Sequence, residues 1–342
     1  MNVFCSALAL ILAAGSLHAQ PPALINAEII DRSSIDDPAE AVRQTENGWF
    51  AFSIPAIEGT RSPCCWKGNW KRSTEFGCSL ERDSRSYGTM STSPLEEYII
   101  AYVNVARGEV KNLRIAGAQC PIDAGGQTVA WIGEPGDRDS LDWFEELARS
   151  ANADGMDGSA LWALALHASD GASDRLRSLA QESHQDLAQQ SIFWLGEARG
   201  GPGYEALKDL LDTMPAGEIR RHINFALSQN SLDRATRLLA DIAREDHDPE
   251  QRADALFWLA QEHPAVAEDI ILDVIENEQD DEILERAVFA LSQLPPETSG
   301  PALLALVRNN EAPREVRRQA MFWLAHEGDE QSVQALTDLI TH

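Results

Sequence analysis

The sequence predicts an α-solenoid that follows a small, disulfide-bonded, mostly-β domain. The main observation is an internal repeat, in which segments such as RADALFWLAQ (252–261) and RRQAMFWLAH (317–326) recur along the second half of the chain. Repeats of about 20–50 residues are typical of stacked architectures. The recurring aromatic residue appears at steps of 32, 32, 32 and 33 residues, at Phe193, Phe225, Phe257, Phe289 and Phe322. Two further observations support this division: the cysteines lie before residue 121, and most of the acidic charge lies after residue 139.

Residues 1–19 have the pattern of a signal peptide. An apolar run, NVFCSALALILAAG (2–15), precedes Leu17-His18-Ala19, which suits signal-peptidase cleavage after Ala19. The run is too short for a permanent membrane-spanning helix, and the alternative is a buried N-terminal helix. We therefore expect a periplasmic or secreted protein without membrane insertion after cleavage.

Four cysteines remain after this cleavage, and an even number in an exported chain favours disulfides. A bridge between the adjacent Cys64 and Cys65 would strain the peptide between them, so we expect Cys78 and Cys120 each to pair with one of these two. A zinc site is the alternative, but the spacing lacks two C-x2-C pairs. No C-x-x-C-H haem motif is present. We predict disulfides, with no metal and no cofactor.

Residues 20–139 predict the small β-rich domain. The β-prone run at 49–57 and a pair of runs at 97–105 and 110–115, separated by a glycine-containing turn, indicate strands and a hairpin. Residues 129–132 indicate another strand, and Asp36-Asp37-Pro38 a turn or a helix start. The composition of the segment 60–94 predicts long loops held by disulfides. Within it, Trp66, Lys67, Trp70, Lys71 and Arg72 either recognise a glycan or peptide or cover the disulfides.

The net charge of −27 is unevenly distributed. Residues 20–139 contain 12 basic and 17 acidic residues, a net charge of −5, whereas residues 140–342 contain 16 and 38, a net charge of −22. Binding to phosphate backbones or anionic lipids requires Lys and Arg, so nucleic acid and membrane surfaces are poor partners. Basic proteins and cations remain compatible with this surface.

Residues 140–342 predict about six helix pairs and a terminal capping helix at 330–340. In each repeat the first helix carries leucines at helical spacing, and the second carries the aromatic segment. Pro249, Pro264 and Pro313 mark helix starts, where the missing N–H of proline costs nothing. A single pair cannot bury its apolar face, so stacking of neighbouring pairs supplies the core.

The segment VRRQA (316–320), followed by Leu324-Ala325, resembles the second helix of HEAT repeats of the phycobilisome-lyase type. Asp246 and Arg252 match the Asp and Arg that such repeats place in ladder positions. The FWLG and FALSQ segments are similar to those of exported bacterial HEAT-repeat proteins. The resemblance covers about 200 residues and implies a HEAT-like α-solenoid.

Two kinds of enzyme are built on such repeats, phycobilin lyases and deoxyhypusine hydroxylase. The hydroxylase binds iron through several His-Glu dyads, whereas this chain has one, His326-Glu327. A phycobilin pathway does not fit an exported chain with disulfides. No G-x-S-x-G, H-E-x-x-H or phosphate loop is present. We therefore predict that the protein is not an enzyme.

A helical wheel places Val316, Ala320, Trp323 and Leu324 in one core stripe and directs Phe322 away from it. One interpretation makes the phenylalanines an exposed ridge on the inner surface that binds a peptide, and the other packs each ring against the next repeat. The residues four positions later are expected either to bind a peptide backbone or to join successive turns, and they include Gln229, Gln261, Gln293 and His326. The alternation of Trp and Ala at 194, 226, 258, 290 and 323 indicates matching of core volume.

Together these observations predict a non-catalytic scaffold of the cell envelope that binds a protein or peptide, including a basic one, through the inner surface of the solenoid. An envelope enzyme or thiol-redox protein, with chemistry around Cys64, Cys65 and Cys78, is one alternative. A purely structural or assembly role is the other.

Overall fold

The computed structural model describes residues 21–22, 24–65, 78–80, 87–88, 94–150, 156–215 and 217–327. The chain divides into two compact units, residues 1–140 and 141–342, which are described separately below. The predicted signal peptide, the loop from Trp66 to Arg72 and the predicted capping helix lie outside the described residues. None of the helices in the described ranges is long and apolar enough to cross a membrane.

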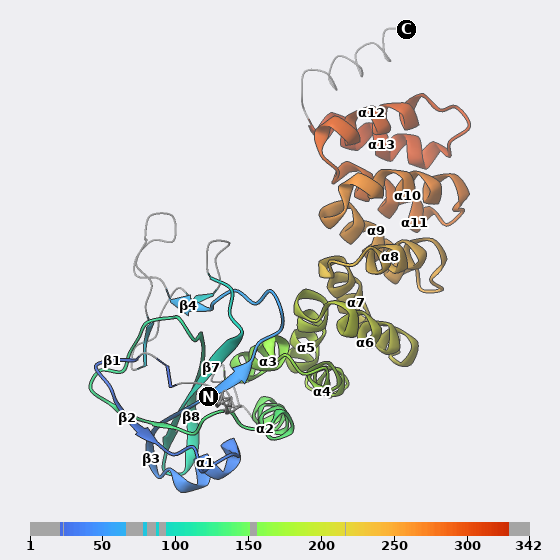
Figure 1. Cartoon of the computed structure of the whole chain (residues 1–342). Helices are drawn as coiled ribbons and strands as arrows, with labels where there is room; N and C mark the ends of the chain where they lie inside the picture. The colour runs from blue at the N-terminus through green and yellow to red at the C-terminus, as the bar shows by residue number, and fades with distance from the viewer. Residues whose placement is uncertain are drawn as a thin grey trace, which may run out of the picture. The chain divides into compact units, whose positions relative to one another are not determined.

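The first unit is built on a five-stranded mixed sheet (Figure 1). Its strand order is β2-β10-β3-β7-β8, with β10 parallel to both of its neighbours and the β3–β7 and β7–β8 pairs antiparallel. These strands are β2 (Glu28–Asp31), β3 (Asn47–Pro55), β7 (Tyr98–Ala106), β8 (Glu109–Gly117) and β10 (Thr128–Trp131).

Short strands complete this unit. One small sheet has the order β1-β9-β5, and another pairs β4 with β6. Their bounds are β1 (Leu24–Ile25), β4 (Cys64–Cys65), β5 (Cys78–Ser79), β6 (Tyr87–Gly88) and β9 (Ile122–Asp123). The predicted mostly-β domain is therefore present, and most of its regular structure lies in the larger sheet.

Local signals in the sequence fix two parts of this unit. The hairpin β7–β8 turns at Arg107 and Gly108, whose φ angles of 58° and 72° are left-handed, as a tight hairpin requires. Helix α1 (Pro38–Gln44) begins after Asp37, whose side chain accepts a hydrogen bond from the backbone N–H of Ala39. Both features were predicted from the sequence.

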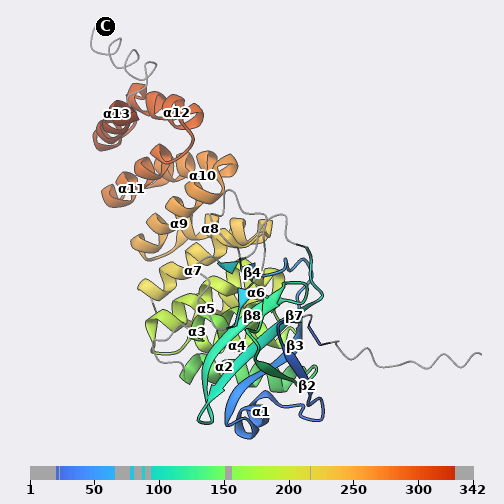
Figure 2. The same ribbon diagram turned by 90° about the vertical axis from the view of Figure 1, so that its left-hand side faces the viewer.

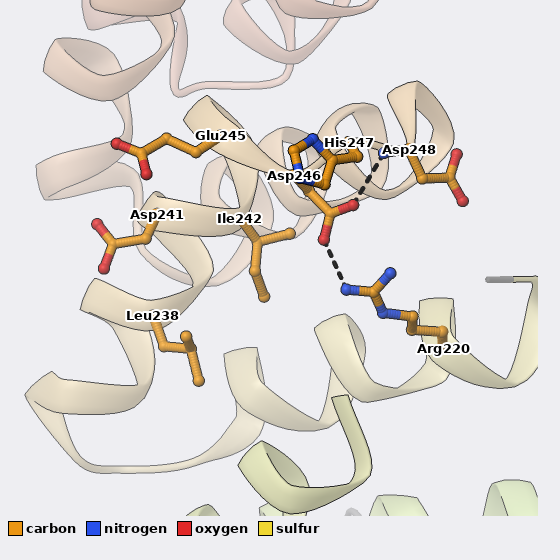
Figure 3. A pocket seen from close by; sticks show the side chains of 8 residues that line it. All are labelled: Arg220, Leu238, Asp241, Ile242, Glu245, Asp246, His247 and Asp248. Atoms are coloured by element: carbon orange, nitrogen blue, oxygen red, sulfur yellow. Dashed lines mark hydrogen bonds and ion pairs between the residues drawn. The ribbon is translucent and has the colours of Figure 1, made fainter. Parts of the chain in front are cut away.

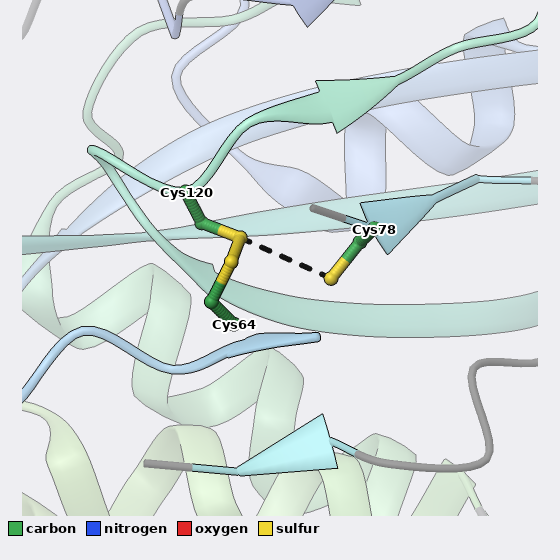
Figure 4. A group of neighbouring side chains, drawn as sticks. All are labelled: Cys64, Cys78 and Cys120. Atoms are coloured by element: carbon green, nitrogen blue, oxygen red, sulfur yellow. Dashed lines mark hydrogen bonds between the residues drawn. A yellow bond between two sulfur atoms is a disulfide. The ribbon is translucent and has the colours of Figure 1, made fainter. Parts of the chain in front are cut away.

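Three cysteines, Cys64, Cys78 and Cys120, lie in the apolar core beside the five-stranded sheet. Cys64 and Cys120 form a disulfide, packed with Trp49, Tyr102 and other buried side chains. The Sγ atom of Cys78, which is itself disulfide-bonded, lies 3.9 Å from that of Cys120 (Figure 4). The Cys64–Cys120 bond agrees with the predicted pairing scheme. The side chain of Cys65 lies outside the described part.

The second unit consists of stacked helix pairs. The first helices of the pairs form one column: α2 (Asp137–Ser150), α4 (Gly171–Ala180), α6 (Gly200–Thr213), α8 (Asp233–Glu245), α10 (Pro264–Asn277) and α12 (Pro296–Arg308). The second helices form the other: α3 (Met156–Leu166), α5 (Gln185–Ala198), α7 (Glu218–Gln229), α9 (Pro249–Glu262), α11 (Asp281–Ser292) and α13 (Arg314–Glu327). Figure 2 shows the two columns from α8 to α13 side by side.

Helix starts follow from capping residues. Asp248 and Asp280 accept backbone N–H bonds at the starts of α9 and α11, and Pro249 and Pro264 occupy first-turn positions as predicted. Alanines and leucines on facing sides of the helices are buried, and they make the continuous core that stacking requires. The predicted paired-helix solenoid is confirmed.

Candidate binding surface on the second helices

Aromatic side chains of the second helices form one continuous series of ring contacts, which we call the aromatic row. Between repeats, Phe193 stacks on Phe225 with ring centroids 6.0 Å apart, and Phe257 on Phe289 with centroids 6.3 Å apart. Within each Phe-Trp pair the two rings meet edge to face, at 4.9–5.1 Å. The row comprises Trp162, Phe193, Trp194, Phe225, Phe257, Trp258, Phe289, Phe322, Trp323 and His326.

Tryptophans continue the row across the remaining joints between repeats. The ring centroids of Phe225 and Trp258 are 4.5 Å apart, and those of Phe289 and Trp323 are 5.2 Å apart. The pattern therefore repeats every two helix pairs: a Phe-Phe contact alternates with a Phe-Trp contact. Such tilted and offset pairs each contribute about 0.5–1.5 kcal/mol beyond simple burial.

The phenylalanine rings are neither fully exposed, as a ridge would be, nor fully buried between repeats. Phe193, Phe225, Phe257 and Phe289 are half-buried, because each contacts a ring of the next repeat. Phe322, on the last described second helix, is 58% exposed. The rings thus pack between repeats and also keep part of their surface accessible.

The prediction that Trp194, Trp258 and Trp323 match core volume was wrong. These indoles are half-buried in the aromatic row, whereas Ala226 and Ala290 at the alternate positions are fully buried. The helical wheel failed because an indole is long enough to extend from the edge of the core stripe to a ring on the neighbouring helix. The rest of the stripe was predicted correctly, since Val316, Ala320 and Leu324 are buried.

Ala226 also permits a close approach of α5 and α7. A Cβ atom added to the buried Gly196 of α5 would lie 2.1 Å from the carbonyl oxygen of Ala226. No ordinary atom pair tolerates that distance, so this joint requires glycine. The alternation of Trp and Ala in the sequence therefore corresponds to two kinds of contact between second helices. The tryptophans make ring contacts, and Ala226 allows a close backbone approach.

The glutamines that follow the phenylalanines line one edge of the row. The side chains of Gln229 and Gln293 donate hydrogen bonds to Ser228 and Ser292, the residues before them, at 3.3 and 3.1 Å. Both are partly exposed, and Gln261 is exposed, as is His326. In the described structure, none of these recorded bonds joins two turns, so the predicted turn-joining ladder is not formed by these glutamines.

The turns are joined instead by Arg199, Asn230 and His263, which were not predicted from the sequence. Arg199 is 1% exposed and donates to the carbonyl oxygens of Ala165, His167 and Ser169 at 3.2, 2.5 and 2.9 Å. It thereby satisfies carbonyl groups at the end of α3 and in the following turn. Burial lowers the pKa of the Arg199 guanidinium from its usual value.

The next two turns use different donors at the corresponding place. The amide of Asn230 donates to the carbonyl oxygens of Gly196 and Gly200, at 3.4 and 3.0 Å, and His263 Nε2 lies 3.0 Å from the carbonyl oxygen of Ser228. The side chains of arginine, asparagine and histidine have in common only that each carries an N–H donor. A spacing of about one repeat was the only signal that could have found them.

Ion pairs join repeats at the other end of the second helices. Arg220 on α7 donates to Asp246 at 2.8 Å, and Asp246 also accepts the backbone N–H of Asp248 at 2.9 Å (Figure 3). One repeat later, Arg252 pairs with Glu278. Asp246 and Arg252 thus occupy ladder positions, as the resemblance implied, and each pairs with a neighbouring repeat.

Carboxylates lie along this same end, at least one in the first turn of each second helix from α5 to α13. One in each helix lies seven residues before the phenylalanine, at Asp186, Glu218, Glu250, Glu282 and Glu315. Arg221 lies 3.6 Å from Glu250, and the Gln189 amide donates to Glu218 at 3.4 Å. At the opposite end, burial and the negative charge of Glu262 raise the pKa of Glu197. Carboxylates therefore lie at both ends of the second helices that carry the aromatic row, and two of them, Glu250 and Glu315, are paired with Arg221 and Arg318.

The helix pairs define the second unit as a HEAT-like α-solenoid. No family model matches the sequence, and no curated protein sequence matches it. Solved structures similar to the chain include the complex of CpcE and CpcF of phycocyanin lyase from Nostoc sp. PCC7120, at 19% identity and a TM-score of 0.34, covering 45% of this chain and 99% of that one.

Two other solved structures are also similar to the chain. Human deoxyhypusine hydroxylase in complex with glycerol is 17% identical with a TM-score of 0.27, covering 59% of this chain and 78% of that one. Kap121p is 13% identical with a TM-score of 0.34, covering 55% of this chain and 25% of that one. At these values the likenesses carry no argument about activity or partner.

Proposed function

We propose that this protein is a non-catalytic scaffold of the cell envelope that binds a protein or an extended peptide on the aromatic row. The aromatic row is the observation that carries the proposal. Its rings contribute to the stacking of the repeats, yet they leave a line of apolar surface between polar edges. Contiguous apolar surface of this kind marks interaction sites, and aromatic side chains are enriched at the cores of protein interfaces.

The polar groups beside the row favour a basic partner. Residues 140–342 carry a net charge of −22, and carboxylates occur at both ends of the second helices. Complementary charge accelerates association and excludes partners of the wrong sign. The exposed amide of Gln261 and the partly exposed amides of Gln229 and Gln293 are placed to hydrogen-bond a peptide backbone.

A periplasmic or secreted location completes the proposal. The signal-like segment at 1–19 motivates it, and the Cys64–Cys120 disulfide is of the kind that persists in oxidising compartments. Cys64, Cys78 and Cys120 are each only 4–5% exposed. Catalytic thiol exchange needs accessible sulfur, so this burial supports a structural role for them.

The proposal is tested by selecting peptides from a phage-displayed random library on the full mature chain and measuring their Kd. A triple variant, Phe225→Leu, Phe257→Leu and Phe289→Leu, removes rings but retains apolar volume. We expect its Kd to rise at least tenfold, because each lost ring contact is worth about 0.5–1.5 kcal/mol. The matched control is Val266→Ser, which removes a 45% exposed apolar side chain from a first helix.

Circular dichroism must show that the triple variant keeps its helix content. Equal affinities for the wild type and the triple variant would contradict the proposal, as would an equal loss of affinity in Val266→Ser. The selected peptides are expected to be enriched in Lys and Arg, and replacing these by Glu should weaken binding.

A further inference from the structure

The joint between α7 and α9 contains buried oxygen atoms that lack hydrogen-bond donors. At this joint Phe225 contacts Trp258, so it forms part of the aromatic row. The two atoms are Asn224 Oδ1 and Asp254 Oδ2, neither of which has a hydrogen-bond partner of normal geometry. A buried acceptor without a donor costs about 1–3 kcal/mol, so this arrangement requires an explanation.

The orientation of Asn224 is fixed by its other contacts. Asn224 is fully buried, and its Nδ2 donates to the backbone oxygen and the Oε1 atom of Gln251, at 3.1 and 3.2 Å. Turning the amide over would place its oxygen against these two acceptors. The amide oxygen of Asn224 therefore remains without a donor.

Asp254 differs from the residues at equivalent positions. It stands four residues before Trp258, whereas glutamines, Gln190 and Gln319, stand four residues before Trp194 and Trp323. A glutamine amide brings its own N–H donors, but an ionised carboxylate brings none. A neutral carboxyl group brings one O–H donor, which is what the two acceptor oxygens at this joint lack.

We propose that Asp254 is a proton switch of the aromatic row. The neutral carboxyl group stabilises the packing of α7 against α9, and the ionised carboxylate weakens that packing at the Phe225–Trp258 contact. This inference rests on the proposed function insofar as it regulates the binding surface. The change at the joint itself does not depend on any partner.

The electrostatic surroundings agree with this role. Burial raises the pKa of Asp254 to about 6. It outweighs the hydrogen bonds that the Asn224 amide and the Trp258 indole N–H make to the carboxyl group, and the positive charges of Arg221 and His222, all of which lower the pKa. Neither hydrogen bond satisfies Oδ2, which has no donor. Both of these charged neighbours, Arg221 and His222, come from α7.

The sign of the pH effect follows from this raised pKa. The folded joint binds a proton more tightly than the unfolded chain, whose carboxyl has an ordinary pKa near 3.8. The stabilisation from the neutral carboxyl is therefore complete below about pH 4, and it is lost as the pH rises through about 6. A loosened joint exposes amide groups of α9 to exchange.

The test is hydrogen exchange of the full mature chain at pH 5 and pH 7.5, with protection factors corrected for intrinsic exchange rates. We expect the protection of residues 249–262 to fall by about tenfold or more at the higher pH in the wild type, since one pKa unit corresponds to a tenfold change. Asp254→Asn, which is neutral at both pH values, should show no such fall. Asp241→Asn, at an exposed carboxylate on α8, should behave like the wild type.

An Asp254→Asn protein with the same pH response as the wild type would overturn the inference, as would a carboxyl NMR titration of Asp254 near pH 4. The Kd of a library-selected peptide, measured at both pH values, separates this inference from the proposed function. If a peptide binds the row while the exchange of α9 is independent of pH, the switch fails and the function stands. If exchange responds to Asp254 but no peptide binds the row, the function fails and the joint alone is pH-dependent.

Discussion

Replacement of Arg199 by methionine tests how the first repeats are held together. The guanidinium is almost fully buried and donates to three backbone carbonyls and to the hydroxyl of Ser173. Methionine fills a similar space but donates nothing. Arg199→Met therefore removes four hydrogen bonds, although the carbonyl oxygen of Ser169 keeps the backbone N–H of Ala172 as a donor.

The magnitude follows from these groups. Each buried acceptor that loses its partner destabilises the fold by about 1–3 kcal/mol. The variant also buries no charge, and the absence of that desolvation penalty offsets part of the loss. We expect a net loss of roughly 2–4 kcal/mol in the free energy of unfolding. Because solenoid repeats depend on their neighbours, the loss should be concentrated in α3, α4 and α5.

The assay is urea unfolding followed by circular dichroism, with hydrogen exchange to locate the change. Arg234→Met is the matched control, since Arg234 is 42% exposed and pairs with Glu205 at the surface. It should cost less than about 1 kcal/mol. A loss of stability in Arg199→Met no larger than in this control, or one spread evenly over all repeats, would contradict a local role of Arg199 in joining the first repeats.

Two further predictions concern packing and covalent structure. Gly196→Ala should lower the melting temperature clearly, at a cost of about 1–3 kcal/mol, because the added methyl group meets the Ala226 carbonyl oxygen; Gly201→Ala, where only a flexible arginine side chain lies near, should be neutral or stabilising. Replacing Cys64 and Cys120 by serine should cost roughly 2–5 kcal/mol in the first unit, because the bond closes a loop of 56 residues, and it should leave the melting of the solenoid unchanged.

The solenoid was predictable because its signal is repeated. Each second helix brings an aromatic residue at nearly the same interval, and the period alone requires stacked units. The hairpin β7–β8 was predictable because its strands are adjacent in sequence and its turn contains Gly108. The insertion of β10 between β2 and β3 was not, since parallel strands far apart in the chain leave no local signal.

The candidate site was predicted only in part. The phenylalanines were found from the repeat, but the tryptophans were assigned to the core, because a wheel drawn for one helix cannot show a contact with the next. Arg199, Asn230 and His263 were missed, since a turn-joining donor can be any of several residue types. Asp254 was missed because only the packing of α7 against α9 reveals its buried, unpartnered oxygen.

Site-specific photo-crosslinking tests the central claim most directly. A photoreactive phenylalanine analogue is placed at Gln261, an exposed position beside the aromatic row, or at Asp241, an exposed position on the first-helix column. Neither replacement disturbs the core. We expect a library-selected peptide to crosslink at Gln261 and not at Asp241. Crosslinking at Asp241 alone, or equally at both positions, would contradict the claim that the second helices form the binding surface.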